Sequence, residues 1–258
     1  MFKKFFDVWR EYSNPKNILV YQFGKVGSTA LEKSLPGSIH THMLYGNSPC
    51  HVHLAQRRQG IKKIYGFFGD FIKRLAISRR DEIKIVTIVR EPVARNVSMF
   101  FQDLSHWIYH YVGLGNHDNR FTGPEYLEDV FYKSFDHSYI NRWFSDEFQR
   151  FTGIDLVSEA FDVDKGYKVI KNGKFNVLVI RYESFSKLSA AINEFIGVNI
   201  EMDESNIGDD KWYGPLYKEF KRSYAPSSEY MNEMYSYPYV KNYYSDNEIK
   251  GFMKKYGN

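Results

Sequence analysis

Short apolar runs separated by helical patterns predict an α/β fold. Most of these runs consist of β-branched, aliphatic and aromatic residues, as in strands that are buried on both faces of a parallel sheet. One run alternates with a period of two, and Asn172-Gly173 predicts a hairpin turn. We therefore expect a single domain over residues 1–258, with three layers and a mostly parallel central sheet flanked by helices. The expected strands include residues 18–23, 38–44 (the alternating run), 85–89 and 177–180.

The first of these strands ends in a glycine turn, residues 24–29, that predicts a phosphate site. Gly24 and Gly27 let the backbone turn sharply, and Ser28 suits the start of the next helix. Unpaired backbone N–H groups and the helix dipole would converge there with the cation of Lys25. The spacing differs from the NTPase P-loop, in which Lys follows the second glycine. The turn is therefore only P-loop-like, and a glycine turn without a ligand remains an alternative.

A second anion site is predicted at Arg90, directly after the strand of residues 85–89. Ligands of open α/β sheets gather at this carboxyl edge. Pro92 suits the first turn of a helix, and Ser98 follows Arg90 by eight residues on that helix. An Arg and a Ser in these positions can hold one phosphate from two sides. Alternatively, Arg90 pairs with a carboxylate such as Glu91, and Ser98 is only a small helix residue.

These two motifs carry a resemblance to a known family. Residues 22–29, QFGKVGST, resemble the 5′-phosphosulfate loop of sulfotransferases that use 3′-phosphoadenosine-5′-phosphosulfate (PAPS), and residues 90–98, REPVARNVS, resemble their 3′-phosphate motif. Residues 210–213 and 243–249 are similar to the tail of a bacterial branch described as putative capsular polysaccharide synthesis proteins. The resemblance implies a sulfotransferase that uses PAPS, releases 3′,5′-ADP, and acts on a hydroxyl of a carbohydrate or glycan-like acceptor.

Sulfuryl transfer needs a base for the acceptor hydroxyl and stabilisation of negative charge on the departing phosphate. Lys25 lies where it can neutralise that charge. We favour His42 as the base, because it titrates near neutrality and the alternation of its strand places it beside the glycine turn. His40 is the next candidate, followed by His53 or Glu91. A structural hydrogen-bonding role for these histidines is an equal alternative.

The expected nucleotide contacts follow from the motifs and the resemblance. We expect no metal ion, since cations and the helix dipole would hold the leaving group, and Arg90 stands where a Mg²⁺ ligand would be expected. The resemblance implies that the tyrosine-rich segment of residues 205–258 closes over the nucleotide, although packing alone would also explain its tyrosines. The expected nucleotide-binding residues are Lys25, Val26, Gly27, Ser28, Thr29, Ala30, Arg90, Ser98, Lys211 and Tyr213.

Two other functions are compatible with a phosphate site. A nucleotide or sugar kinase would require ATP and Mg²⁺, and the position of Lys25 argues against it. A non-catalytic nucleotide-binding protein would keep both phosphate sites but have no working base.

The amino-acid composition limits the possible binding partners and the cellular compartment of the protein. The chain carries 35 Lys and Arg against 31 Asp and Glu, a balance that does not indicate nucleic acid but is compatible with anionic small molecules. The single cysteine, Cys50, excludes an intrachain disulfide and fits a reducing compartment. The sequence has no apolar run of about eighteen residues and no signal-peptide pattern at its amino terminus. We therefore expect a cytoplasmic protein without a transmembrane segment.

Two segments combine apolar and basic residues. Residues 1–14 predict a helix with an aromatic face beside lysines; it would pack on the domain or, alternatively, contact a membrane surface. Residues 56–80 predict one or two helices rich in Lys and Arg, suited to a solvated face or to a cationic collar for an anionic acceptor.

Overall fold

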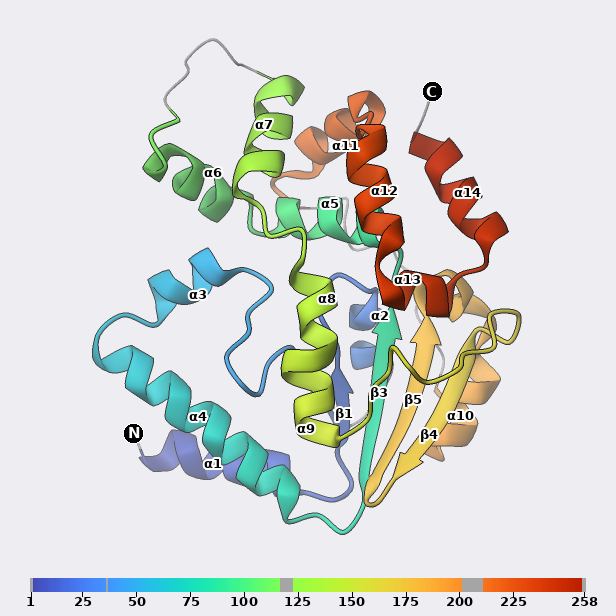
Figure 1. Ribbon diagram of the computed structural model, residues 1–258. Helices are drawn as coiled ribbons and strands as arrows, with labels where there is room; N and C mark the ends of the chain where they lie inside the picture. Colours follow the sequence, from blue (N-terminus) through green and yellow to red (C-terminus); the bar gives the residue numbers. More distant parts are fainter. Residues whose placement is uncertain (1, 36, 117–122, 201–210, 257–258) are drawn as a thin grey trace.

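The computed structural model describes residues 2–35, 37–116, 123–200 and 211–256. Within these ranges it contains a sheet of five strands in the order β2-β1-β3-β5-β4 (Figure 1). The first four of these strands are parallel, and β4 pairs antiparallel with β5. The predicted α/β class and mostly parallel sheet are confirmed. The strands are β1 (Ile18–Tyr21), β2 (Ser38–Thr41), β3 (Ile83–Val89), β4 (Tyr167–Asn172) and β5 (Phe175–Arg181).

Helices cover both faces of the sheet. In the described ranges they are α1 (Phe2–Ser13), α2 (Ser28–Ser34), α3 (His51–Arg57), α4 (Ile61–Ser78), α5 (Pro92–Gln102), α6 (Leu104–Gly113), α7 (Pro124–Ser134), α8 (Tyr139–Trp143), the π-helix η1 (Phe144–Gln149), α9 (Arg150–Thr152), the 3₁₀-helix η2 (Tyr182–Lys187), α10 (Ser189–Ile196), α11 (Gly214–Ser223), α12 (Ser228–Ser236), α13 (Pro238–Tyr243) and α14 (Asp246–Tyr256). Figure 1 shows α8 and α9 in front of the strands and α2 and α10 behind them.

The central strands are apolar because both of their faces are covered. All four residues of β1 are buried, and Tyr21 stacks on Phe148 of η1 with ring centroids 5.7 Å apart. On β3 only Lys84 is partly exposed, and its Nζ donates to the carbonyl of Phe195 on α10. The continuous apolar runs in the sequence therefore correspond to strands enclosed by helices.

Two details of the strands bear on the predictions. The hairpin predicted at Asn172-Gly173 is confirmed, since β4 ends at Asn172 and β5 begins at Phe175. The strand predicted over residues 38–44 ends at Thr41, where its pairing with β1 stops. The prediction was wrong beyond that point because the backbone of residues 44–47 turns away to donate hydrogen bonds to the carboxylate of Glu147 on η1.

The strand order places a switch point between β1 and β3. After β1 the chain crosses through α2 to β2 on one side, and later returns to β3 on the other side. Open α/β sheets bind their ligands outside the carboxyl ends of the two strands at such a point. The two segments that follow β1 and β3 begin with the predicted Lys25 loop and with Arg90.

Candidate functional site

The loop after β1 has an unusual backbone. Gly24 and Gly27 have φ values of +87° and +79°, and Lys25, with φ +61°, is the only non-glycine residue with positive φ in the described ranges. This left-handed conformation is costly for a residue with a Cβ and is retained where the surroundings impose it. Gly27 is required for a further reason, because a Cβ there would lie 2.4 Å from Cε2 of Tyr182 on η2.

Two arginines hold the carbonyls of this loop. Arg95 of α5 is fully buried and donates from Nη2 to the carbonyl of Phe23 (2.6 Å) and from Nε to that of Gly24 (3.1 Å). Arg90 donates from Nη1 to the carbonyl of Lys25 (2.7 Å). Because the carbonyl and N–H of a peptide group point in opposite directions, the following N–H groups face away from the arginines. In the described part of the chain, the N–H groups of Lys25, Val26 and Gly27 have no acceptor.

Arg90 is free to bind an anion with its remaining donors. Its guanidinium lies over the ring of Tyr182, 4.4 Å from the centroid. The alternative that it pairs with Glu91 is wrong, because Glu91 caps α5 by accepting from the N–H groups of Val93 and Ala94, both at 2.7 Å. Among the described residues Arg90 forms no salt bridge.

Cations gather beside the loop. Lys211 Nζ donates to Oε1 of Gln102 on α5 (2.8 Å), and Lys25 Nζ lies 3.5 Å from the same oxygen. Tyr213 Oη also donates to it, at 3.3 Å. Burial, together with the charges of Lys211, Arg90 and Arg95, lowers the pKa of Lys25 to about 8. A site in which neighbouring cations lower the pKa of a lysine favours a bound anion.

The histidines beside the loop have different environments. His40 Nδ1 lies 3.0 Å from Oε1 of Glu32, and its Nε2 lies 2.6 Å from Nε2 of Gln22. The N–H of Gly24 donates to Oε1 of Gln22 and so fixes the orientation of that amide. His40 therefore accepts at Nε2, and both of its ring nitrogens are engaged.

His42 lies beside the Gly24 turn, because a Cβ on Gly24 would be 3.6 Å from Cε1 of His42. Its Nδ1 donates to the carbonyl of Gln22 (2.9 Å), which leaves Nε2 with the lone pair. Within the described residues Nε2 has no hydrogen-bond partner. Burial lowers the pKa of His42 to about 4, and His40 contributes to this shift. Of the two histidines, His42 alone has the free nitrogen that a base needs.

The remaining predicted residues have varied positions. Ser28 is buried, and its hydroxyl accepts from Gln22 (3.0 Å) and hydrogen-bonds to Glu32. Ser98 lies on α5, two turns beyond Arg90, and is partly buried. Val26 is fully buried, Thr29 is exposed, and Ala30 lies in the first turn of α2. His53 pairs with Asp103 (3.2 Å). The expected start of the C-terminal segment, residue 205, lies outside the described residues.

Sequence reasoning missed the residues that support the site. Arg95 stands among the apolar positions of α5, and nothing in the local pattern distinguishes a buried arginine from a solvated one. Glu147 is fully buried on η1, where its carboxylate accepts from Tyr21 Oη (2.7 Å) and from the N–H groups of Leu44, Tyr45 and Asn47. The sequence segment around it predicts only packing, because its partners lie about one hundred positions away in the chain.

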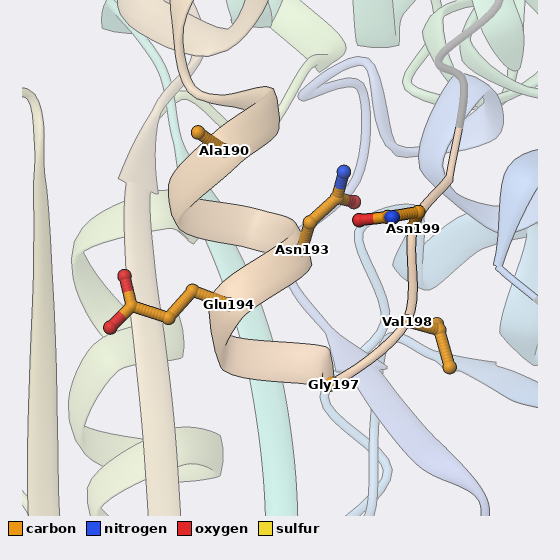
Figure 2. A pocket seen from close by; sticks show the side chains of 6 residues that line it. All are labelled: Ala190, Asn193, Glu194, Gly197, Val198 and Asn199. Atoms are coloured by element: carbon orange, nitrogen blue, oxygen red, sulfur yellow. The ribbon is translucent and has the colours of Figure 1, made fainter.

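Cavities elsewhere in the described residues are less suited to a phosphate. A pocket of about 470 Å³ lies at the end of α10 (Figure 2). Its one charged side chain is an acid, Glu194, and Asn193 and Asn199 point toward one another across it. A smaller pocket of about 130 Å³ lies between residues 46–48 and α8. In the described ranges no three His, Cys, Asp or Glu side chains form a metal-ligand cluster, and no helix has the length and apolar character to cross a membrane.

Comparisons with known proteins address the second half of the chain. Residues 121–245 match the family model described as "Putative capsular polysaccharide synthesis protein". No curated protein and no solved structure gives a significant match. The matched region contains Lys211 and Tyr213, whereas the Lys25 loop and Arg90 precede it. The chain thus resembles this family over residues 121–245, as the sequence of its C-terminal part predicts.

Proposed function

We propose that the protein transfers a sulfuryl group from PAPS to a hydroxyl of a carbohydrate or glycan-like acceptor. The observation that carries the proposal is the meeting of two cationic groups from separate strands at the β1–β3 switch point. Arg90 Nη1 donates to the carbonyl of Lys25 (2.7 Å), and the ammonium groups of Lys25 and Lys211 both contact Oε1 of Gln102. A nucleotide with separate 5′ and 3′ phosphates matches two such groups.

The roles follow from the positions of the side chains and N–H groups. The N–H groups of residues 25–27 and the Lys25 cation would hold the 5′-phosphosulfate, with Ser28, Thr29 and the first turn of α2 beside them. Arg90 and Ser98 would hold the 3′-phosphate, and Lys211 and Tyr213 would close over the nucleotide. The bound anion would raise the pKa of Lys25 above its value of about 8 in the free protein, so that the lysine stays protonated.

In the transfer step the acceptor oxygen forms a bond to sulfur while the bond from sulfur to the 5′-phosphate oxygen breaks. Lys25 stabilises the negative charge that develops on the departing phosphate. His42 Nε2 takes the proton of the acceptor hydroxyl, with its tautomer fixed by the carbonyl of Gln22. The doubly phosphorylated nucleotide would also raise the low pKa of His42 and strengthen it as a base.

The family match supports a glycan acceptor. The name of the matched family refers to capsular polysaccharide synthesis, and the match covers most of the chain after α6. Sulfation of a polysaccharide or its precursor is a modification that fits such a role.

The decisive experiment compares thermal stabilisation by 3′,5′-ADP, 5′-ADP, ATP and Mg·ATP. At equal nucleotide concentrations, we expect 3′,5′-ADP to stabilise the protein most. Its stabilisation should reach about 2.7 kcal/mol when its concentration is one hundred times its dissociation constant. Ser98→Ala should reduce the preference for the 3′-phosphorylated nucleotide, because it removes one donor to that phosphate. Arg90→Lys should reduce this preference more, because a lysine lacks the planar guanidinium that can donate to the Lys25 carbonyl and to the phosphate at the same time.

Other outcomes distinguish the alternatives. If Mg·ATP is needed for stabilisation, and 3′,5′-ADP stabilises no more than 5′-ADP, the protein would be a kinase and the proposal would be contradicted. Tight binding of 3′,5′-ADP without transfer of radiolabelled sulfate from PAPS to any glycan acceptor would indicate a non-catalytic nucleotide-binding protein.

A further inference from the structure

Helix α4 exposes an apolar face to solvent. Its exposed residues recur every three or four positions, so they lie on one side of the helix. Single exposed apolar side chains are common on protein surfaces, but five large ones on one helix form a continuous patch. The exposed fractions are 64% for Ile61, 55% for Ile64, 67% for Phe67, 52% for Phe68 and 46% for Phe71.

The buried face of α4 combines Ala76 and Ile77 with one acidic residue. Asp70 is buried, and its carboxylate accepts from Arg58 Nη1 (3.0 Å) and Lys73 Nζ (3.2 Å). A surface helix usually turns its large apolar residues inward, whereas α4 leaves five of them exposed. The exposed face of α4 therefore suits an apolar partner outside the chain.

Helix α1 extends the patch. Figure 1 shows α1 and α4 side by side near the amino ends of the strands. The Phe5 and Tyr65 rings lie 6.5 Å apart, and Lys73 Nζ lies 5.8 Å from the Tyr12 ring, so the two helices run in the same direction. Phe6 of α1 is 64% exposed. The two helices therefore present a common surface.

Lysines flank the amino-terminal end of this surface. Of the eight Lys and Arg in residues 51–80, Arg80 is buried, and Arg58 and Lys73 pair with Asp70, the one acidic residue of that range. Lys62 and Lys63 are exposed near the start of α4, and Lys3 and Lys4 are exposed at the same end of the parallel helix α1. Exposed apolar side chains beside lysines match a bilayer with anionic headgroups, in which the rings enter the acyl boundary and the lysines remain among the headgroups.

We infer that α1 and α4 dock the protein on an anionic lipid surface, with both helices in the plane of the interface. Neither helix has the length and apolar character to cross a membrane. The two helices precede the amino ends of β1 and β3, whereas Lys25 and Arg90 follow their carboxyl ends. Docking is therefore independent of the proposed sulfotransferase activity and can be tested without it.

The test is co-sedimentation of the full chain with vesicles of phosphatidylcholine, with and without phosphatidylglycerol. We expect binding at least about tenfold tighter when the anionic lipid is present. Phe67→Ser with Phe68→Ser should weaken it at least about tenfold, because two large apolar groups no longer enter the bilayer. Lys62→Glu with Lys63→Glu should weaken binding to the anionic vesicles by at least about tenfold and leave binding to phosphatidylcholine unchanged.

The matched control is Tyr109→Ser, an aromatic residue that is 69% exposed on a different helix, α6. It should bind vesicles as the wild type does. Circular dichroism and thermal unfolding establish that each variant is folded. Wild-type protein that does not sediment with anionic vesicles overturns the inference. It is also overturned if Phe67→Ser with Phe68→Ser converts a dimer to a monomer in light scattering without affecting vesicle binding, since the patch would then join two copies of the chain.

Discussion

At the scale of single residues, the two neighbouring histidines differ in which nitrogen is available. Both ring nitrogens of His40 are engaged, whereas His42 uses only Nδ1. We expect His42→Asn to lower kcat for sulfuryl transfer by about 10²- to 10⁴-fold, the usual contribution of a general base. The asparagine retains a donor for the carbonyl of Gln22, so the dissociation constant of 3′,5′-ADP should change little.

His40→Ala is the comparison for this variant. It removes a ring that is already bonded on both sides, so we expect a smaller loss of kcat. Steady-state kinetics and nucleotide titration of both variants provide the measurement. Loss of turnover in His40→Ala with normal turnover in His42→Asn would assign the base to His40 instead.

Lys25 provides a prediction about pH. Its pKa of about 8 in the free protein means that the ammonium loses its proton as the pH rises through 8. We expect the affinity for 3′,5′-ADP to fall over this range, because only the charged lysine attracts the phosphate. Titration calorimetry from pH 7 to about pH 9 measures the effect.

The free energy of unfolding depends on pH in the opposite direction to the nucleotide affinity. The folded pKa of Lys25 is lower than that of an unfolded lysine, so between the two values the unfolded chain binds more protons. The contribution of Lys25 to the free energy of unfolding therefore rises with pH above 8 while nucleotide affinity falls. Lys25→Gln should remove the inflection near pH 8 from both profiles; an affinity profile of the wild type without that inflection would contradict the role given to Lys25.

At the scale of secondary-structure elements, the π-helix η1 positions the loop that follows β2. Glu147 on η1 accepts hydrogen bonds from Tyr21 Oη of β1 and from the backbone N–H groups of Leu44, Tyr45 and Asn47. π-Helices are frequent at functional sites. Here the wider turn holds a buried carboxylate beside the segment that follows His42 in the chain.

Glu147→Gln tests this arrangement. An amide presents an NH₂ group where one carboxylate oxygen accepted, so at least one backbone N–H loses its acceptor. We expect the free energy of unfolding to fall by about 2 to 4 kcal/mol, measured by urea denaturation. Asp146→Asn, an exposed neighbour on the same element, should change it by less than about 0.5 kcal/mol. Equal effects of the two substitutions would show that the buried carboxylate does not hold the loop.

At the scale of the whole molecule, the sheet order brings the two anion-binding segments together. β1 and β3 are adjacent and parallel, although about sixty residues separate them in the sequence. α5, which follows β3, then supplies Arg95 and Gln102 to the loop that follows β1. The single-domain organisation expected from the sequence stays a prediction, as does the cytoplasmic location.

The sequence by itself determined the class of fold and the two loops of the candidate site. Continuous apolar runs of strand length favour strands that are covered on both faces, and Gly24, Gly27 and Pro92 favour a particular local backbone. Only the tertiary structure decided which polar residues act together. The free nitrogen of His42, the buried charges of Arg95 and Glu147 and the outward apolar face of α4 all depend on partners, or on the lack of them, from distant parts of the chain. A local pattern of residues contains no information about such neighbours, because their interactions arise only when the elements pack.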